Sequence, residues 1–294
     1  MPLKPREVAE SFDLPDRELV IAGDWHANWA WIGRAIPAAA RTGAATVLHL
    51  GDFGFWPSES EDLLRIIDDW VASTHANPSR PGIDRVLITP GNHEDWTDLD
   101  AIFAEAPGQA VRVSDHVWVM PRGFRFTIGG RTFMSFGGAA SVDFASRQPG
   151  RTWWASEIPT MTETEAAATS GSVDVLLTHD AGALFGPRVT KMLTRRAREW
   201  SPTARAYATY SRQLIEAVVA GVKPALHLHG HYHVRESTTF ALDDHSLVRV
   251  ECLAMDNQLG NLALLDLTAP SVTDIDVHRR STSPLQRWAP DEWQ

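Results

Sequence analysis

Cysteine is the scarcest informative residue in this chain, because Cys252 is the only one among 294 residues. A single cysteine makes no intramolecular disulfide and offers no set of thiolates, so any metal site has to use His, Asp, Asn or Glu. Long apolar runs are missing too: no segment approaches the roughly 18 residues of a membrane span, and residues 1–12 hold no signal-peptide core. We expect a cytoplasmic protein without membrane contact.

Positive charge is also in short supply. The chain has 27 Lys and Arg residues against 37 Asp and Glu residues, a formal net charge of -10. This balance argues against a sequence-independent grip on nucleic acid, although it leaves room for one local anion site. Repeats, low-complexity tracts and long linkers are absent as well. We therefore expect one domain over 1–294, with a core of about 17–268 and a tail over 269–294.

One pattern is present five times: a short apolar run stops at a small residue and is followed at once by a potential ligand. The segments are ELVIAGDWH with Asp24 and His26, TVLHLGD with Asp52, RVLITPGNH with Asn92 and His93, DVLLTHD with His179, and ALHLHGHYH with His231 and His233. Each run is typical of a strand with a donor at its carboxyl end. Carboxylates, an amide and imidazoles without sulfur form a set suited to Mn, Fe or Zn.

Helical patterns lie between these strands, over 29–40, 60–76, 97–105 and 203–220. Strands that alternate with helices predict a largely parallel sheet, with the ligand crevice beyond the carboxyl ends of its strands. Two hairpins, turning at Gly129-Gly130 and near Asp243-Asp244, and the later strand NLALLDL break this alternation. From them we expect a second, mainly antiparallel sheet packed on the first, with helices outside.

The five motifs resemble those of a known family. Their order and spacing resemble those of the calcineurin-like metallophosphoesterases. The matching motifs are Asp24-x-His26, Gly51-Asp52, Gly91-Asn92-His93-Glu94, His179 and Gly230-His231-x-His233. The resemblance implies an α/β fold that is a four-layer α/β/β/α sandwich, with two mixed sheets flanked by helices. It also implies a hydrolase that uses two divalent metal ions, Mn first, with Fe, Zn or Ni as alternatives.

The resemblance further implies a role for each matching residue. One metal would be held by Asp24, His26, Asp52 and His233, and the other by Asp52, Asn92, His179 and His231. Asp52 would bridge the metals and, as a catalytic residue, orient the metal-bound hydroxide that attacks phosphorus. His93 matches the family's catalytic histidine, which faces the leaving-group oxygen as a general acid or stabilises developing charge.

Two features favour phosphodiesters as the substrate. GDFGFWP lacks the further Asp, or the Asp-Arg-Gly of protein phosphatases, that many members of the family carry after the second motif. The paired histidines of GHYH are typical of the phosphodiesterase and nuclease branches. We predict hydrolysis of nucleotide or nucleic-acid phosphodiesters, with no obligate protein partner. The alternatives are a phosphomonoesterase, including a protein phosphatase, and a non-catalytic module that binds phosphate through its metals.

Residues 137–160 have two interpretations. They form a loop whose tryptophans fill the core, which we expect for Trp154, or they cover the metal cleft. As a cover, Arg147 would contact phosphate and Trp153 would stack on a base. Asn92 is a further candidate for substrate binding.

Two more clusters accompany the motifs. The first is a set of basic residues at helical spacing: Arg188, Lys191, Arg195 and Arg198. They form either a solvated helix face or a rim of the cleft that guides a polyanion. His227 and His229 lie inside the last motif strand. There we expect His229 to support a ligand through a hydrogen bond and His227 to be ordinary packing.

Overall fold

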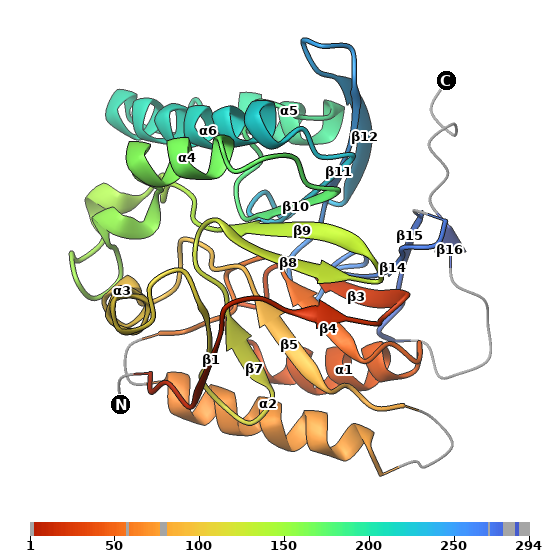
Figure 1. Ribbon diagram of the computed structural model, residues 1–294. Coiled ribbons are helices and arrows are strands. Elements are labelled where there is room, and N and C mark those ends of the chain that lie inside the picture. Colours follow the sequence, from red (N-terminus) through yellow and green to blue (C-terminus); the bar gives the residue numbers. More distant parts are fainter. Residues whose placement is uncertain (1–2, 57–58, 77–80, 270, 279–285, 288–294) are drawn as a thin grey trace.

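The computed structural model describes residues 3–56, 59–76, 81–269, 271–278 and 286–287. Two sheets pack face to face and helices cover their outer faces, so the layers run helix, sheet, sheet, helix (Figure 1). The expected α/β sandwich of two mixed sheets is confirmed. Among the helices of the described chain, none has both the length and the apolar character needed to cross a membrane.

The first sheet has nine strands within the described residues, and its centre is parallel. In spatial order they are β1 (Glu7–Ala9), β6 (Ala110–Arg112), β7 (Val117–Val119), β5 (Arg85–Ile88), β4 (Thr46–His49), β3 (Glu18–Ala22), β14 (Leu262–Asp266), β15 (Ser271–Asp274) and β16 (Gln286–Arg287). Strands β3, β4, β5 and β7 pair in parallel, and the outer pairs are antiparallel. Strand β15 carries regular structure past residue 268, and 279–285 and 288–294 of the expected tail lie outside the described residues.

The second sheet has seven strands in the same part of the chain. In spatial order they are β12 (Glu236–Ala241), β13 (Leu247–Cys252), β11 (Leu226–His229), β10 (Val175–Thr178), β9 (Arg131–Phe136), β8 (Phe124–Ile128) and β2 (Asp13–Leu14). The expectation of a mainly antiparallel sheet is wrong, because β9, β10, β11 and β13 pair in parallel. Only the two predicted hairpins, β8–β9 and β12–β13, are antiparallel. Two of the motif strands, β10 and β11, join this sheet instead of extending the first, and a helical crossover makes the pair parallel.

The helices largely match the expected ranges. They are α1 (Trp29–Ala40), α2 (Ser60–Thr74), α3 (Trp96–Glu105), α4 (Met161–Ala168), α5 (Pro187–Arg196) and α6 (Pro202–Val222), with short 3₁₀ turns η1 (Phe144–Ser146) and η2 (Ala155–Glu157). Helices α1 and α2 lie outside the first sheet, and α4, α5 and α6 lie on the opposite side of the molecule (Figure 1). Polar caps explain the starts, since Asn28 accepts from Trp31 N and Ser201 accepts from Ala204 N.

The motif strands are apolar on both faces because both faces are covered. In β3, Leu19 and Ile21 belong to the core between the sheets, whereas Val20 and Ala22 belong to the core beneath the helices. This alternation follows from the two-residue repeat of a strand. The predicted donors follow the ends of these strands within four residues, so they lie at the same end of the sandwich.

Candidate metal centre

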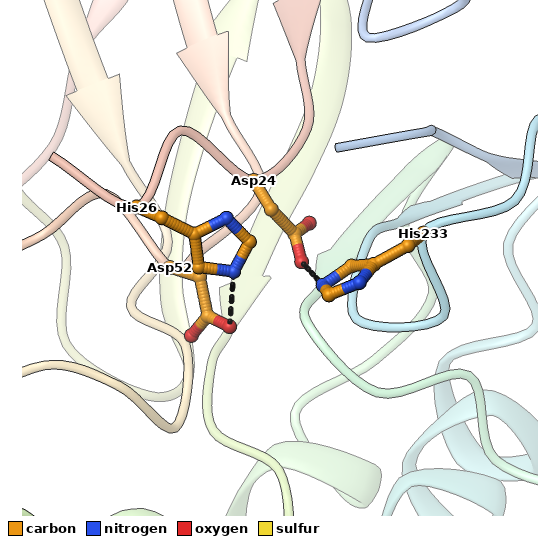
Figure 2. Close-up of side chains that lie close together, drawn as sticks. All are labelled: Asp24, His26, Asp52 and His233. Carbon is orange, nitrogen blue, oxygen red and sulfur yellow. Dashed lines mark ion pairs between the residues drawn. The ribbon is translucent and has the colours of Figure 1, made fainter. Parts of the chain in front are cut away.

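Four predicted ligands converge at the carboxyl ends of the strands. They are Asp24, His26, Asp52 and His233 (Figure 2). Each offers one ligand atom, and these four atoms all lie within 4.8 Å of one another. His26 Nε2 lies 3.6 Å from Asp52 Oδ2, and His233 Nε2 lies 3.0 Å from Asp24 Oδ2. The His26 and His233 side chains are 23% and 39% exposed. We call this group the open half of the centre.

One atom of the open half tests whether the group suits a cation. Asp24 is fully buried, yet its Oδ2 accepts no aligned hydrogen bond within the described chain, even though His233 Nε2 is close. A buried carboxylate oxygen without a donor is costly. A divalent cation between Asp24 and His233 would satisfy that oxygen, so the residues fit a metal.

Asn92 and His179 lie close together on the other side of Asp52. His179 Nε2 lies 3.3 Å from Asp52 Oδ1 and 3.2 Å from Asn92 Oδ1, while His179 Nδ1 donates to Leu50 O at 2.6 Å. The His231 ring packs 5.1 Å from the His179 ring, centroid to centroid. The His179 side chain is 0% exposed. We call Asp52, Asn92, His179 and His231 the deep half.

Charges of opposite sign compensate each other across Asp52. Burial alone would raise the pKa of Asp52, but the nearby His179 and His93 hold it well below its ordinary value. Burial lowers the pKa of His179 and of His26, yet the Asp52 carboxylate outweighs burial and raises them to about 10 and about 9. Because a metal takes the neutral imidazole, cation binding would release these protons.

The backbone beneath the donors is strained. Asp52, His26, His231 and His233 have φ values of 52°, 47°, 67° and 56°, a region that residues other than glycine rarely occupy. Such strain persists only where surrounding contacts enforce it, and it clusters at functional sites. A glycine also allows close approach: a Cβ at Gly230 would lie 2.3 Å from Asp24 Oδ1.

Two acidic residues form hydrogen bonds that position the predicted donors or their loops. Asp256 Oδ1 lies 3.1 Å from His26 Nδ1 and leaves His26 Nε2 for the open half, and Asn257 Nδ2 donates to Asp256 Oδ2 at 2.6 Å. Sequence reasoning missed Asp256 because it lies in no motif and follows His26 by 230 residues. Glu94 accepts from Phe53 N and Gly91 N, both at 2.6 Å, and thereby joins the loops after β4 and β5.

His93 and Arg147 meet beside Asp52. His93 N donates to Asp52 Oδ1 at 2.9 Å, and Arg147 Nη1 donates to His93 Nδ1 at 2.9 Å. Asp143 orients the guanidinium by accepting from Arg147 Nε at 2.8 Å. Burial, with a contribution from the Arg147 charge, lowers the pKa of His93 although Asp52 opposes it. The segment 137–160 therefore does reach the centre.

The two tryptophans of that segment differ. Trp154 is buried in the core beneath the helices of the first sheet, as expected, and its Nε1 donates to Thr97 Oγ1 at 2.8 Å. Trp153 is partly exposed; its Nε1 donates to Glu157 Oε1 at 3.0 Å, and its ring packs on Phe144 with centroids 5.6 Å apart. Its predicted contact with substrate stays a prediction.

The histidines inside β11 are buried. His227 Nε2 is 2.7 Å from Thr178 Oγ1, and His229 Nδ1 is 3.1 Å from Gly230 O. Burial lowers the pKa of both imidazoles, and that of His229 falls to about 4. His231 and His233 lie in the loop beyond β11, so the strand ends before the donors begin.

The basic cluster lies on α5 and the turn after it. Its apolar side, with Val189, packs in one small core with Tyr232, which separates His231 from His233. Its other side is exposed and carries Arg188, Lys191, Arg195, Arg196 and, just past the helix, Arg198. The helix thus borders the loop that brings a donor to each half.

Fold and donors together define a class, an α/β sandwich with a nitrogen–oxygen cation site at the ends of its strands. The chain belongs to the calcineurin-like phosphoesterase family, whose model matches residues 18–235. The resemblance found in the motifs is thereby confirmed. Members of this family are phosphoester hydrolases that use divalent metals, and the converging donors of the open half agree with that.

The solved structures that this chain resembles are distant from it in sequence. The protein TT1561 of Thermus thermophilus is 12% identical, with a TM-score of 0.52 over 90% of this chain and 100% of that one. An archaeal phosphodiesterase is 14% identical, with a TM-score of 0.40 over 88% and 98%. A dimetal phosphatase from Danio rerio is 8% identical, with a TM-score of 0.47 over 88% and 95%. The first likeness shows the fold alone and the other two support no argument; a search of curated proteins finds no match.

Proposed function

We propose that this protein is a phosphodiesterase with a dinuclear metal centre that hydrolyses nucleotide or nucleic-acid phosphodiesters. The observation that carries the proposal is the position of Asp52. Its Oδ2 faces His26 in the open half and its Oδ1 faces His179 in the deep half. One carboxylate shared in this way suits two cations about 3.5 to 4 Å apart.

We favour Mn as the cation, with Fe, Zn or Ni as alternatives. Carboxylate, amide and imidazole ligands without thiolate accept all four, so availability decides among them. When bound, such a pair of cations polarises the phosphoryl group and supplies a nucleophile at neutral pH. The chain contributes the arrangement: Asp24, His26 and His233 hold one cation, Asn92, His179 and His231 hold the other, and Asp52 holds both.

His93 and Arg147 are the groups proposed to act on the substrate itself. The His93 side chain is 30% exposed and lies beside Asp52, where it can meet the leaving-group oxygen. Arg147 carries a guanidinium fixed by Asp143, which suits a phosphate oxygen. Asn92 and Trp153 complete the proposed contacts with substrate. His93 and Asn92 lie near Asp52 and His179, and Arg147 and Trp153 belong to the segment 137–160.

One panel of substrates tests the activity. Bis-p-nitrophenyl phosphate, p-nitrophenyl phosphate, cyclic nucleotides and short oligonucleotides are each assayed with Mn, Fe, Zn and Ni, with His93→Ala as the control. We expect diesters to be turned over faster than monoesters and His93→Ala to lower turnover about 10²-fold or more. Faster turnover of monoesters would favour the phosphomonoesterase, and metal binding without any turnover would favour the phosphate-binding module.

The exposed face of α5 supports a polyanionic substrate. Among the described residues, Lys191, Arg195 and Arg198 form no ion pair with an acidic side chain, although acidic residues outnumber basic ones overall. A rim of this kind concentrates phosphates near the cleft.

Salt dependence tests the role of α5. Turnover of an oligonucleotide should fall steeply with added salt, whereas turnover of bis-p-nitrophenyl phosphate should hardly change. Arg195→Gln combined with Arg198→Gln should flatten the first dependence. Arg65→Gln, on the exposed side of α2, is the matched control. Equal salt responses of the two substrates would remove α5 from the proposal.

A further inference from the structure

The side-chain amide of Asn92 has two unlike ends, and only one of them suits a cation. Its Oδ1 lies 3.2 Å from His179 Nε2 in the deep half, and its Nδ2 donates to Ser141 Oγ at 3.0 Å. A flipped amide would turn two N–H donors toward the cation and would lose this ligand. The fold therefore needs a way to distinguish the two orientations.

Ser141 distinguishes them because its single hydroxyl proton is already used. Ser141 Oγ donates to Glu157 Oε2 at 2.7 Å, so toward Asn92 the same oxygen only accepts. An acceptor at that position selects the NH₂ end of the Asn92 amide and leaves Oδ1 facing His179. The orientation of the Asn92 amide thus depends on the Glu157 carboxylate, which acts through Ser141.

Glu157 has the surroundings of a terminal acceptor. The residue is 0% exposed, and besides Ser141 Oγ its carboxylate accepts from Ser141 N at 2.7 Å, Tyr207 OH at 2.9 Å and Trp153 Nε1 at 3.0 Å. All four donors are neutral, and no described cationic side chain forms an ion pair with this carboxylate. A buried carboxylate is costly without such donors. The donors fix the position of both carboxylate oxygens.

Arg122 links the backbone of Glu157 to Trp96, which in turn contacts the loop that carries Asn92. The guanidinium donates from Nε to Gly137 O at 3.0 Å and from Nη2 to Glu157 O at 3.1 Å, so it closes the segment 137–157 at both ends. It also stacks over Trp96 at 4.2 Å, and Trp96 Nε1 donates to Gly91 O at 3.0 Å. Acceptor and amide are therefore held by one rigid support.

We propose that Ser141 and Glu157 are positioning residues that hold the Asn92 amide with Oδ1 toward the deep half and so set the affinity of that half for a divalent cation. The inference rests on the proposed function, since it takes Asn92 as a metal ligand. Neither residue touches substrate. Both act through the orientation of one planar group.

Metal binding alone tests the proposal, with Mn²⁺ as the probe. At pH 8, where Glu157 is ionised, calorimetric titration of metal-free protein in a His233→Ala background reports the deep half, and titration in a His179→Ala background reports the open half. Ser141→Ala and Glu157→Gln should weaken the deep half about 10- to 100-fold and leave the open half unchanged. Ser141→Thr keeps the hydroxyl and should restore binding. Equal weakening of both halves, or no weakening of the deep half, overturns the proposal.

Asn92→Asp supplies a matched background for the same test. A carboxylate has two equivalent oxygens, so its binding needs no choice between two ends. In this background Ser141→Ala should have little effect on the deep half; a loss as large as that beside Asn92 would mean that Ser141 only supports the loop. Melting temperatures verify folding, and the Ser141 variants decide the matter if Glu157→Gln does not fold. Because no substrate is used, missing turnover would refute the proposed function and leave this result intact.

Discussion

The open and deep halves of the centre share Asp52, but they are built differently. The open half adds the carboxylate of Asp24 and two partly exposed imidazoles, of which His26 is backed by Asp256. The deep half adds no second carboxylate, only the amide of Asn92 and two imidazoles, and His179 is fully buried. We therefore expect the open half to bind a cation mainly through the charge of its carboxylates. We expect the deep half to bind one mainly because its side chains are held in fixed positions.

Asp52→Asn should have the largest effect, because it removes the one carboxylate that both halves use. We expect loss of both metals and a fall in turnover of about 10³-fold or more. Elemental analysis after dialysis measures the first, and bis-p-nitrophenyl phosphate measures the second. Asp69→Asn, whose side chain is 75% exposed on α2, is the control. Retention of a full metal complement would show that Asp52 is not shared.

His179→Ala and His233→Ala should differ in stability as well as in binding. Removing the buried His179 ring leaves a cavity and an unpaired Leu50 O, so the free energy of unfolding of the metal-free chain should fall by about 2 kcal/mol or more. The His233 ring is partly exposed and its removal leaves no closed cavity, so the loss should be smaller than for His179, although Asp24 loses its nearest imidazole. Chemical denaturation compares the two. Equal losses would contradict the division into deep and open.

The pH dependence of stability should trace the support of the deep half. Burial raises the pKa of Glu157 from 4.5 to about 7, so the folded chain holds this proton more tightly than the unfolded chain does. The stability that this proton contributes is complete below pH 4.5 and is lost as the pH rises through 7. Between pH 5 and pH 8, metal-free wild type should lose about 2 kcal/mol more than Glu157→Gln. Glu165→Gln, exposed on α4, should behave like wild type.

Asp256→Asn should have the smallest effect and confine it to the open half. A carboxylate that orients a ligating imidazole contributes about 10-fold to metal affinity, so the open half should weaken by about that factor. The deep half should keep its affinity for Mn²⁺, measured in the same titration. A matched loss in the deep half would mean that Asp256 acts on the fold and not on His26.

Most helices and strands could be predicted from the sequence, but the residues that hydrogen-bond to the predicted donors could not. Local signals such as the cap at Asn28 define α1 at its predicted limits, and three of the five motifs supply the four side chains that converge in the open half. The second sheet was expected to be mainly antiparallel because its hairpins are visible locally, whereas the parallel pairing of β9 with β10 joins distant segments. Asp256 and Glu157 have no motif, and only tertiary structure brings them to His26 and Ser141.

The division of the donors between two sheets has a consequence for the amount of protein in a cell. Donors after β3, β4 and β5 come from one sheet, and donors after β10 and β11 come from the other, so a chain with either sheet unfolded has no complete centre. Cation binding then favours only the assembled sandwich, by about 2.7 kcal/mol at a 100-fold excess over Kd. We expect cells starved of the cation to degrade this protein faster, so that metal supply regulates its abundance as well as its turnover.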